Sequence, residues 1–474
     1  MVFSSLSFLL FFLPCVLIVY HLLPRVLKNA WLVIASIAFY AFGEPKFVFL
    51  FLLEIVWNWA LAILIARAHA GSAKKLLLGL CLSGDLIVLG LFKYSSFFVQ
   101  SINGAIGTDF PLPGFILPIG ISFYTFQEIS YVVDVYRGEE ARKNPVDVAL
   151  YLSFFPQLVA GPIVRWREIA PQLSRRRSSW SGVSDGFQRF CLGLCKKVLL
   201  ADQLAILVTH VFDRVTKPES LAAPILWMAA IAFWLQIYFD FSGYSDMAIG
   251  LGAMFGFRIP ENFRQPYLAK TATEFWRRWH MTLSGWFRDY VYVPLGGSRG
   301  GPAKTIRNLL LVWVLTGLWH GAGWTFLLWG LLWGVLLILE KFLIRPEERG
   351  KTFRLFYRLL TVLLMILFWV PFRASTVQHA LVLLGHLFSP AAWALSSVQL
   401  PAIRMWCHEM WLYLLVGTLL VFDLPQRLFT RLVPGAEQSA WVDMLRLALL
   451  GVCVCVSLSF LVNGNYSPFL YFQF

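Results

Sequence analysis

The chain has 474 residues, of which 58% are hydrophobic and only 14% are charged. Soluble globular chains are closer to half apolar and one quarter charged, so this composition excludes an ordinary soluble enzyme and predicts a polytopic membrane protein. The formal net charge of +14 does not favour nucleic-acid binding, because the lysines and arginines stand in short loops between apolar runs, where they set membrane orientation. We therefore predict an all-α fold, a bundle of transmembrane helices that forms a single membrane domain over residues 1–474.

The apolar runs divide the chain into candidate membrane segments, and a spanning helix needs about 20 mostly apolar residues. Several runs are shorter, or are interrupted by Gly and Pro, which predicts re-entrant pieces surrounded by protein. The first run has no Lys or Arg before it, so it is a better first transmembrane helix than a cleavable signal peptide. The candidate runs cover residues 5–23, 30–43, 47–66, 76–99, 115–136, 147–162, 187–211, 222–252, 308–344, 354–372, 409–424 and 441–463.

The charges of the loops predict the orientation of the first helices. Basic loops follow the first and third runs, at residues 24–29 and 67–75, and basic loops favour the cytoplasm. The loop near Glu44 and the almost uncharged loop 101–114 then fall outside, and the loop 137–144 returns to the cytoplasm. These assignments alternate without contradiction, with the N-terminus outside.

Two later runs break this alternation. Residues 147–162 and 308–344 each have basic flanks on both sides, and both flanks favour the cytoplasm. Pro156 and the glycine and proline after it would interrupt a straight helix in the first of these runs. Glycines interrupt the second run around His320. We predict a re-entrant hairpin that enters from the cytoplasmic side in each case.

His320, in the stretch LTGLWHGAGWTF, is the strongest single candidate for chemistry. The limb before it would rise by about 20 Å inside a hydrocarbon core of about 30 Å, which places the histidine at membrane depth. An ionisable group there is costly and by default marks a functional site, and histidine can act as a general base at neutral pH. The flanking glycines would let a substrate or another backbone approach closely. The alternative is a packing histidine bonded to a carbonyl oxygen.

Residues Thr271–Tyr290 are predicted to form one interfacial helix that begins with a capping box of Thr271 and Glu274. At about 100° per residue its aromatic side chains share one face and its arginines lie on the other. His280 falls at the edge of the aromatic face, which leaves two interpretations. It is either a histidine of an aromatic belt at the membrane surface or a polar group directed into a cavity beneath that surface.

Other polar residues within apolar segments also have structural alternatives. Asp240 and Asp246 flank a Ser-Gly-Tyr-Ser sequence that predicts a break in a helix. A carboxylate there could orient a histidine, stabilise a cavity or cap a helix end. Lys196 and Lys197 are expected to extend to the cytoplasmic surface. The sequence has no CxxC, HxxxH or HExxH spacing, so we predict no metal site.

Several stretches together resemble the membrane-bound O-acyltransferase family, and more narrowly its bacterial alginate O-acetyltransferase branch. The paired histidine motifs are the most specific: WRRWHMTLSGWFRDYVYVPLGG contains His280, and LTGLWHGAGWTFLLWG contains His320. The stretches LPIGISFYTFQEISYVVDVYRG, FFPQLVAGPIVR and YFDFSGYSDMAIGLG agree with it. The resemblance covers most of residues 1–345, the expected catalytic core, and weakens over residues 346–474, the expected C-terminal transmembrane helices.

The resemblance implies a transmembrane O-acyltransferase in which His320 and His280 are the catalytic residues. In this branch the acyl group is an acetyl group that passes from a cytoplasmic donor, acetyl-CoA, across the bilayer toward an exported polysaccharide such as alginate. The resemblance further implies a multi-pass protein of the cytoplasmic (inner) membrane with no bound cofactor. It also implies a separate extracytoplasmic acetyltransferase as partner. The candidate substrate-binding residues are Trp279, Asp240, Arg277 and Arg278, whose two arginines could attract an anionic donor.

Two alternatives of the same mechanism remain open, namely O-acetylation of peptidoglycan and D-alanylation of teichoic acid. A third alternative belongs to another class, because broken helices at membrane depth are also compatible with a transporter of polysaccharide or of a lipid-linked sugar.

Overall fold

The structure is a computed structural model that describes residues 2–69, 71–214, 221–433, 439–464 and 469–470. Every regular element in these residues is a helix. The chain divides into two compact units, residues 1–190 with 244–261 and residues 191–243 with 262–474. Two of the three divisions fall inside helices, α10 and α12, and the third falls in the loop after α12.

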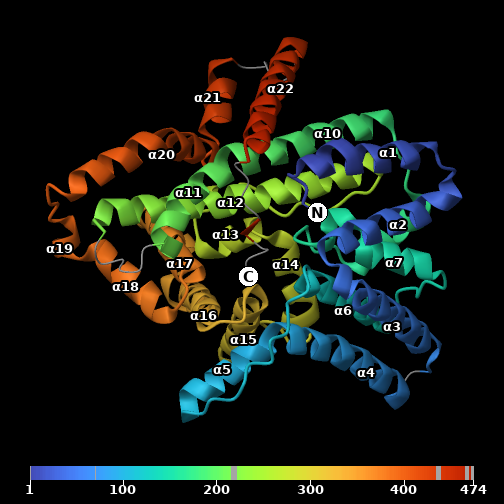
Figure 1. Ribbon diagram of the computed structural model, residues 1–474. Helices are drawn as coiled ribbons and strands as arrows, with labels where there is room; N and C mark the ends of the chain where they lie inside the picture. Colours follow the sequence, from blue (N-terminus) through green and yellow to red (C-terminus); the bar gives the residue numbers. More distant parts are fainter. Residues whose placement is uncertain (1, 70, 215–220, 434–438, 465–468, 471–474) are drawn as a thin grey trace. The chain divides into compact units, whose positions relative to one another are not determined.

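The first unit consists of the N-terminal helices, in which α3 packs against both α4 and α6 (Figure 1). A π-helical turn, Phe8–Phe12, precedes α1 and another, Gly90–Tyr94, joins α4 to α5. The helices are α1 (Leu13–Leu22), α2 (Arg25–Gly43), α3 (Val48–Arg67), α4 (Ser72–Leu89), α5 (Ser95–Ile106), α6 (Ile121–Arg137), α7 (Pro145–Ser153), α8 (Phe155–Leu158), α9 (Trp166–Arg175) and most of α10 (Trp180–Cys195).

The second unit holds both histidine motifs. A π-helical segment, Lys196–Ala201, continues α10 into α11, and a second, Glu340–Ile344, follows α16. The helices are α11 (Asp202–Thr209), most of α12 (Ala223–Met254), α13 (Ala272–Arg278), α14 (Met281–Phe287), α15 (Pro302–His320), α16 (Trp324–Leu339), α17 (Lys351–Arg373), α18 (Val377–Phe388), α19 (Pro390–Trp393), α20 (Gln399–Val421), α21 (Leu424–Leu432) and α22 (Ala440–Val462).

Within the described residues, seven helical segments are long and apolar enough to cross a membrane, and the pair α20–α21, bent by 62°, would make eight. Six of the seven begin at or near α2, α3, α4, α12, α16 and α17, and the last is α22. The predicted all-α, multi-pass membrane protein is therefore confirmed. The run predicted over 147–162 is broken at Phe154, between α7 and α8, so it does not form one straight helix.

The run predicted over 308–344 forms two helices, α15 and α16, that lie side by side (Figure 1), and its re-entry from the cytoplasmic side stays a prediction. Its glycines serve the packing of the two helices. A Cβ atom on Gly317 would lie 2.5 Å from the carbonyl oxygen of Phe326, and one on Gly330 would overlap the carbonyl oxygen of Trp313. Because only glycine permits these backbone approaches, the register between the two helices is fixed by backbone contact.

Candidate active site

The helix predicted over Thr271–Tyr290 is two short helices in the structure, so that prediction was wrong. α13 ends at Arg278 and α14 begins at Met281, and His280 lies in the junction. His280 has φ +42°, in the left-handed region that non-glycine residues seldom adopt. Aromatic periodicity continues through this junction, which is why the sequence pattern did not reveal it.

The predicted capping box is half formed. Thr271 Oγ1 accepts a hydrogen bond from the backbone N–H of Glu274 at 3.1 Å, as expected. The Glu274 carboxylate, however, accepts from the N–H of Lys270 at 2.8 Å. A second carboxylate caps the helix from α16's end, because Glu340 accepts from the first two N–H groups of α13 at 2.7 and 2.8 Å. Glu340 thereby fixes the start of the segment that carries His280.

Asn262 holds the His280 ring in place. The Asn262 side-chain oxygen lies 3.0 Å from His280 Nδ1, and it also accepts from the hydroxyl of Thr282 at 2.9 Å and the N–H of Thr282 at 3.4 Å. A backbone N–H can only donate, so the shared atom is an oxygen and His280 Nδ1 carries the proton. Burial lowers the pKa of His280 to about 3. The ring is therefore neutral at neutral pH, with its lone pair on Nε2.

His320 is the last residue of α15 and is only 4% exposed. Its ring lies among aromatic rings, with centroids 4.9 Å from those of Trp319 and Trp329 and 5.2 Å from that of Phe372. The centroid of the His280 ring is 6.5 Å away. The structure thus brings together two histidines that are far apart in the sequence, inside one aromatic cluster.

Trp279 belongs to the wall of this cluster. It is buried, and its ring lies 4.9 Å from Phe263, 5.5 Å from Phe275 and 5.3 Å from Trp369. Phe241, on α12, meets the His280 ring edge-on at 4.6 Å. The neighbours of the histidines are therefore mainly aromatic carbon, a low-dielectric environment that strengthens any electrostatic interaction made there.

Asp240 lies inside a continuous helix and pairs with a lysine, and it does not cap a helix end. Helix α12 runs without interruption through the Ser-Gly-Tyr-Ser sequence, so the predicted break was wrong and neither Asp240 nor Asp246 caps a helix end. Asp240 Oδ1 lies 2.6 Å from Lys197 Nζ. A Cβ on Gly243 would lie 2.8 Å from the carbonyl oxygen of Gly193, so the sequence is a close contact between α10 and α12.

Lys197 was predicted to reach the membrane surface, and this was wrong because it is 1% exposed. It pairs with Asp240 and, at 2.8 Å, with Asp202. The two carboxylates remove the need for the lysine to extend to water. The carboxylate five residues after the lysine was the signal for this pairing, and it was not used.

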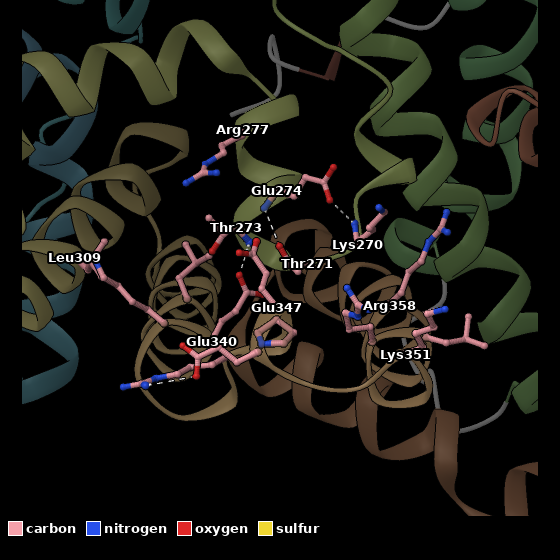
Figure 2. Close-up of a pocket in the computed structure, with 17 residues that line it drawn as sticks. Lys270, Thr271, Thr273, Glu274, Arg277, Leu309, Glu340, Glu347, Lys351 and Arg358 are labelled. Atoms are coloured by element: carbon pink, nitrogen blue, oxygen red, sulfur yellow. Dashed lines mark hydrogen bonds and ion pairs between the residues drawn. The ribbon is translucent and has the colours of Figure 1, made fainter.

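The two arginines before the histidine differ in their surroundings. Arg278 pairs with Glu274 at 2.7 Å along α13. Arg277 is exposed and faces a pocket of about 1040 Å³ (Figure 2). The pocket lies between the start of α13 and the segments Glu340–Glu348 and Lys351–Arg358. Its basic lining residues are Lys270, Arg277, Lys341, Arg345, Lys351, Arg354 and Arg358, and its acidic ones are Glu274, Glu340, Glu347 and Glu348.

The pocket is lined by more cationic side chains than carboxylates. Arg277, Lys351, Arg354 and Arg358 form no ion pair with any of the described residues. The Glu340 carboxylate, which also lines the pocket, accepts hydrogen bonds from the first N–H groups of α13 and, at 2.8 Å, from the hydroxyl of Tyr357. Exposed cations without partners attract anionic ligands. The pocket also reaches Leu309 on α15, eleven residues before His320, a rise of about 16 Å.

Two functional contacts were missed in the sequence. Asn262 precedes the histidine motif by 18 residues, and nothing in the local pattern links the two. Glu340 stands at the end of an apolar run, where a carboxylate is unusual, and that position was a usable signal. Among the described residues, no group of three or more His, Cys, Asp and Glu side chains is placed to hold a metal ion.

Comparison with known proteins decides the family. Residues 142–358, which include both histidines, match the profile of MBOAT, the membrane-bound O-acyltransferase family. The "Probable alginate O-acetylase AlgI" of Pseudomonas syringae pv. tomato is 45% identical over 407 residues, which are 84% of this chain and 77% of that protein. The chain belongs to the membrane-bound O-acyltransferase family. As a member of that family, it is an O-acyltransferase.

Other members of the family are similar over comparable lengths. The "Probable alginate O-acetylase AlgI" of Pseudomonas putida is 41% identical over the full length of both chains. The "Peptidoglycan O-acetyltransferase" of Helicobacter pylori is 37% identical over 80% of this chain and 78% of its own. The two names describe O-acetylation, of alginate by the first protein and of peptidoglycan by the second.

Proposed function

We propose that this protein transfers an acetyl group from acetyl-CoA, at the cytoplasmic side of the inner membrane, toward the hydroxyl groups of an exported, alginate-like polysaccharide. The observation that carries the proposal is the pair of buried histidines, whose ring centroids are 6.5 Å apart. The chain that holds them is 41% identical along its whole length to a protein named as an alginate O-acetylase. Peptidoglycan is the alternative candidate for the acceptor, and the 37% identical peptidoglycan O-acetyltransferase favours it.

The proposed reaction needs one basic nitrogen at the acceptor. His320, as the general base, takes the proton of an acceptor hydroxyl while the hydroxyl oxygen attacks the acyl carbon. The C–S bond of the thioester breaks as the new C–O ester bond forms, and the imidazolium returns its proton to the leaving thiolate. His280, held by Asn262 with its lone pair on Nε2, completes the polar pair and orients the group that is transferred. Aromatic walls exclude water from this exchange.

The basic pocket supports a donor that carries phosphates. In this proposal the phosphates of acetyl-CoA bind the cations around Arg354 and Arg358, and the pantetheine arm covers the distance to His320. Arg354 is exposed and Arg358 is half-buried, which agrees with a soluble donor that enters from the cytoplasm. On the other side, a separate extracytoplasmic acetyltransferase is the proposed partner that completes transfer to the polymer.

The proposal is tested with purified protein in lipid vesicles. Supplied with acetyl-CoA, a polysaccharide acceptor and the proposed extracytoplasmic partner, the protein is expected to release free thiol while acetyl ester forms in step. Mass analysis of the surface glycans of a deletion strain then names the acceptor, because only the true acceptor loses its acetyl groups. Movement of glycan across the vesicle membrane without release of thiol would contradict the proposal and favour the transporter.

The pocket gives a prediction of its own. We expect Arg354→Glu together with Arg358→Glu to raise KM for acetyl-CoA about fivefold, the effect of about 1 kcal/mol for exposed charges, with little change in kcat. The same protein should use acetyl-pantetheine as well as the wild type does, because that donor lacks the nucleotide phosphates. Steady-state kinetics with both donors measure the difference.

Arg446→Glu on α22 provides the control for charge, because Arg446 is an exposed arginine that does not line the pocket. Its KM for acetyl-CoA should stay at the wild-type value. Equal losses with both donors in the pocket variant would show that the pocket does not bind phosphate.

A further inference from the structure

A buried ionic cluster lies in the second unit, outside the histidine pair. Lys197, in the π-helical segment that follows α10, has its ammonium 2.6 Å from Asp240 and 2.8 Å from Asp202. All three side chains are almost fully buried. Burying such charges in apolar surroundings costs free energy. Removing one member of the cluster lowers the stability of the fold more than replacing all of them with apolar residues.

The cluster also contacts residues 469–470. Asp240 Oδ2, the oxygen that does not face the lysine, accepts a hydrogen bond from the backbone N–H of Leu470 at 2.9 Å. Lys197 Nζ lies 4.6 Å from the centroid of the Phe469 ring, in the geometry of a cation–π contact. Phe469 and Leu470 are 1% and 4% exposed. Residues 469–470 are thus held inside the unit by a carboxylate and an ammonium.

The cluster and the histidines are connected through consecutive residues of α12. Asp240 is followed at once by Phe241, whose ring meets His280 edge-on at 4.6 Å. Leu470 packs in the same apolar cluster as Phe241 and Trp279. Leu470 is therefore linked to the helix that contacts His280 through its hydrogen bond to Asp240, the residue before Phe241.

A brace between α10 and α12 would need only the lysine and one carboxylate. The second oxygen of Asp240 instead accepts a hydrogen bond from the backbone N–H of Leu470. We propose that Asp240 and Lys197 are positioning residues that hold residues 469–470 as a water-excluding segment beside the histidines. This inference rests on the proposed acyl transfer.

The segment matters because a thioester at the histidines has two possible acceptors. In transfer, the acceptor oxygen bonds to the acyl carbon, the C–S bond breaks, and the acceptor proton ends on the thiol. In hydrolysis, water supplies the oxygen and the products are acetate and the same thiol. Because both reactions release thiol, the ratio of acetate to acetyl ester reports how well water is excluded.

The first test compares Leu470→Pro with Leu470→Met in the full-length protein in lipid vesicles. Proline has no backbone N–H and so removes the donor to Asp240 without shortening the chain, whereas methionine keeps the N–H and most of the apolar volume. With acetyl-CoA and acceptor present, we expect Leu470→Pro to raise the acetate-to-ester ratio about fivefold or more. Leu470→Met should keep the wild-type ratio.

A second pair of variants decides the question if Leu470→Pro does not fold. Asp240→Asn and Asp202→Asn make the same chemical change against the same lysine, but only Asp240 contacts residue 470. We expect the ratio to rise in Asp240→Asn alone, while both lower the unfolding temperature. If both variants reduce thiol and ester in parallel at an unchanged ratio, the cluster is a brace and the inference is overturned. A wild-type protein that releases no thiol would instead overturn the proposed function.

Discussion

Replacing His320 with alanine is expected to abolish acyl transfer while leaving the protein in the membrane. A positioned general base contributes about 10²–10⁴-fold to rate, and the loss should fall in or above that range. The reason is geometric, because His320 lies at the end of α15 in the aromatic cluster, with His280 as its polar neighbour. Ester formation and thiol release by the purified variant, beside acetylation of the surface glycan in cells, measure the effect.

His320→Asn is the matched control for this experiment, because asparagine keeps a polar side chain of similar size but has no basic nitrogen. It should be as inactive as alanine and closer to the wild type in unfolding temperature. Glycan acetylation at the wild-type level in either variant would remove His320 from the catalytic role.

His280→Ala is expected to cause a partial to severe loss, about 10- to 100-fold in kcat. The substitution removes the ring that Asn262 fixes and that contacts Phe241. Burial lowers the pKa of His280 to about 3. His280 therefore stays neutral over the whole pH range near neutrality in which activity is measured. The residual activity should therefore keep the pH dependence of the wild type, which a pH series of kcat/KM checks.

Asn262→Ala keeps the His280 ring but removes its anchor, so it should reproduce part of the loss. If His280→Ala changes only the amount of protein in the membrane and not its specific activity, His280 is a packing residue of the aromatic cluster. Such a result would leave the role of His320 intact.

Composition and hydropathy were sufficient for the fold class, because the requirement to satisfy every backbone group in lipid leaves helices as the solution for such apolar runs. The hairpin around His320 was also predictable, since Gly317 and the glycines after it mark both a turn and a close helix contact. The proximity of His320 to His280 was not accessible from spacing. It depends on how α13, α14 and α15 pack, which only the structure and the family motifs indicate.

The wrong predictions share a physical cause, which is that local patterns do not register long-range partners. The positive φ of His280 is stabilised by Asn262, which is distant in sequence. The Ser-Gly-Tyr-Ser sequence looked like a helix break, but its glycine admits the backbone at Gly193 and the helix continues. Lys197 has the sequence pattern of a surface lysine, but in the structure it pairs with two aspartates.

The contact between α15 and α16 has a consequence for how the site tolerates change. The height of His320 along the hairpin is set where Gly317 and Gly330 meet the facing main chain, and the size of the surrounding rings does not enter into it. The aromatic side chains can therefore vary, reshaping the space for a different acyl group or acceptor, while the imidazole stays at the same level. The basic pocket, at the far end of α15 from the histidine, is free to change its charge pattern separately. Under the proposed mechanism, the hairpin would keep the reacting centre constant while the specificity for the donor and that for the transferred group or acceptor change separately.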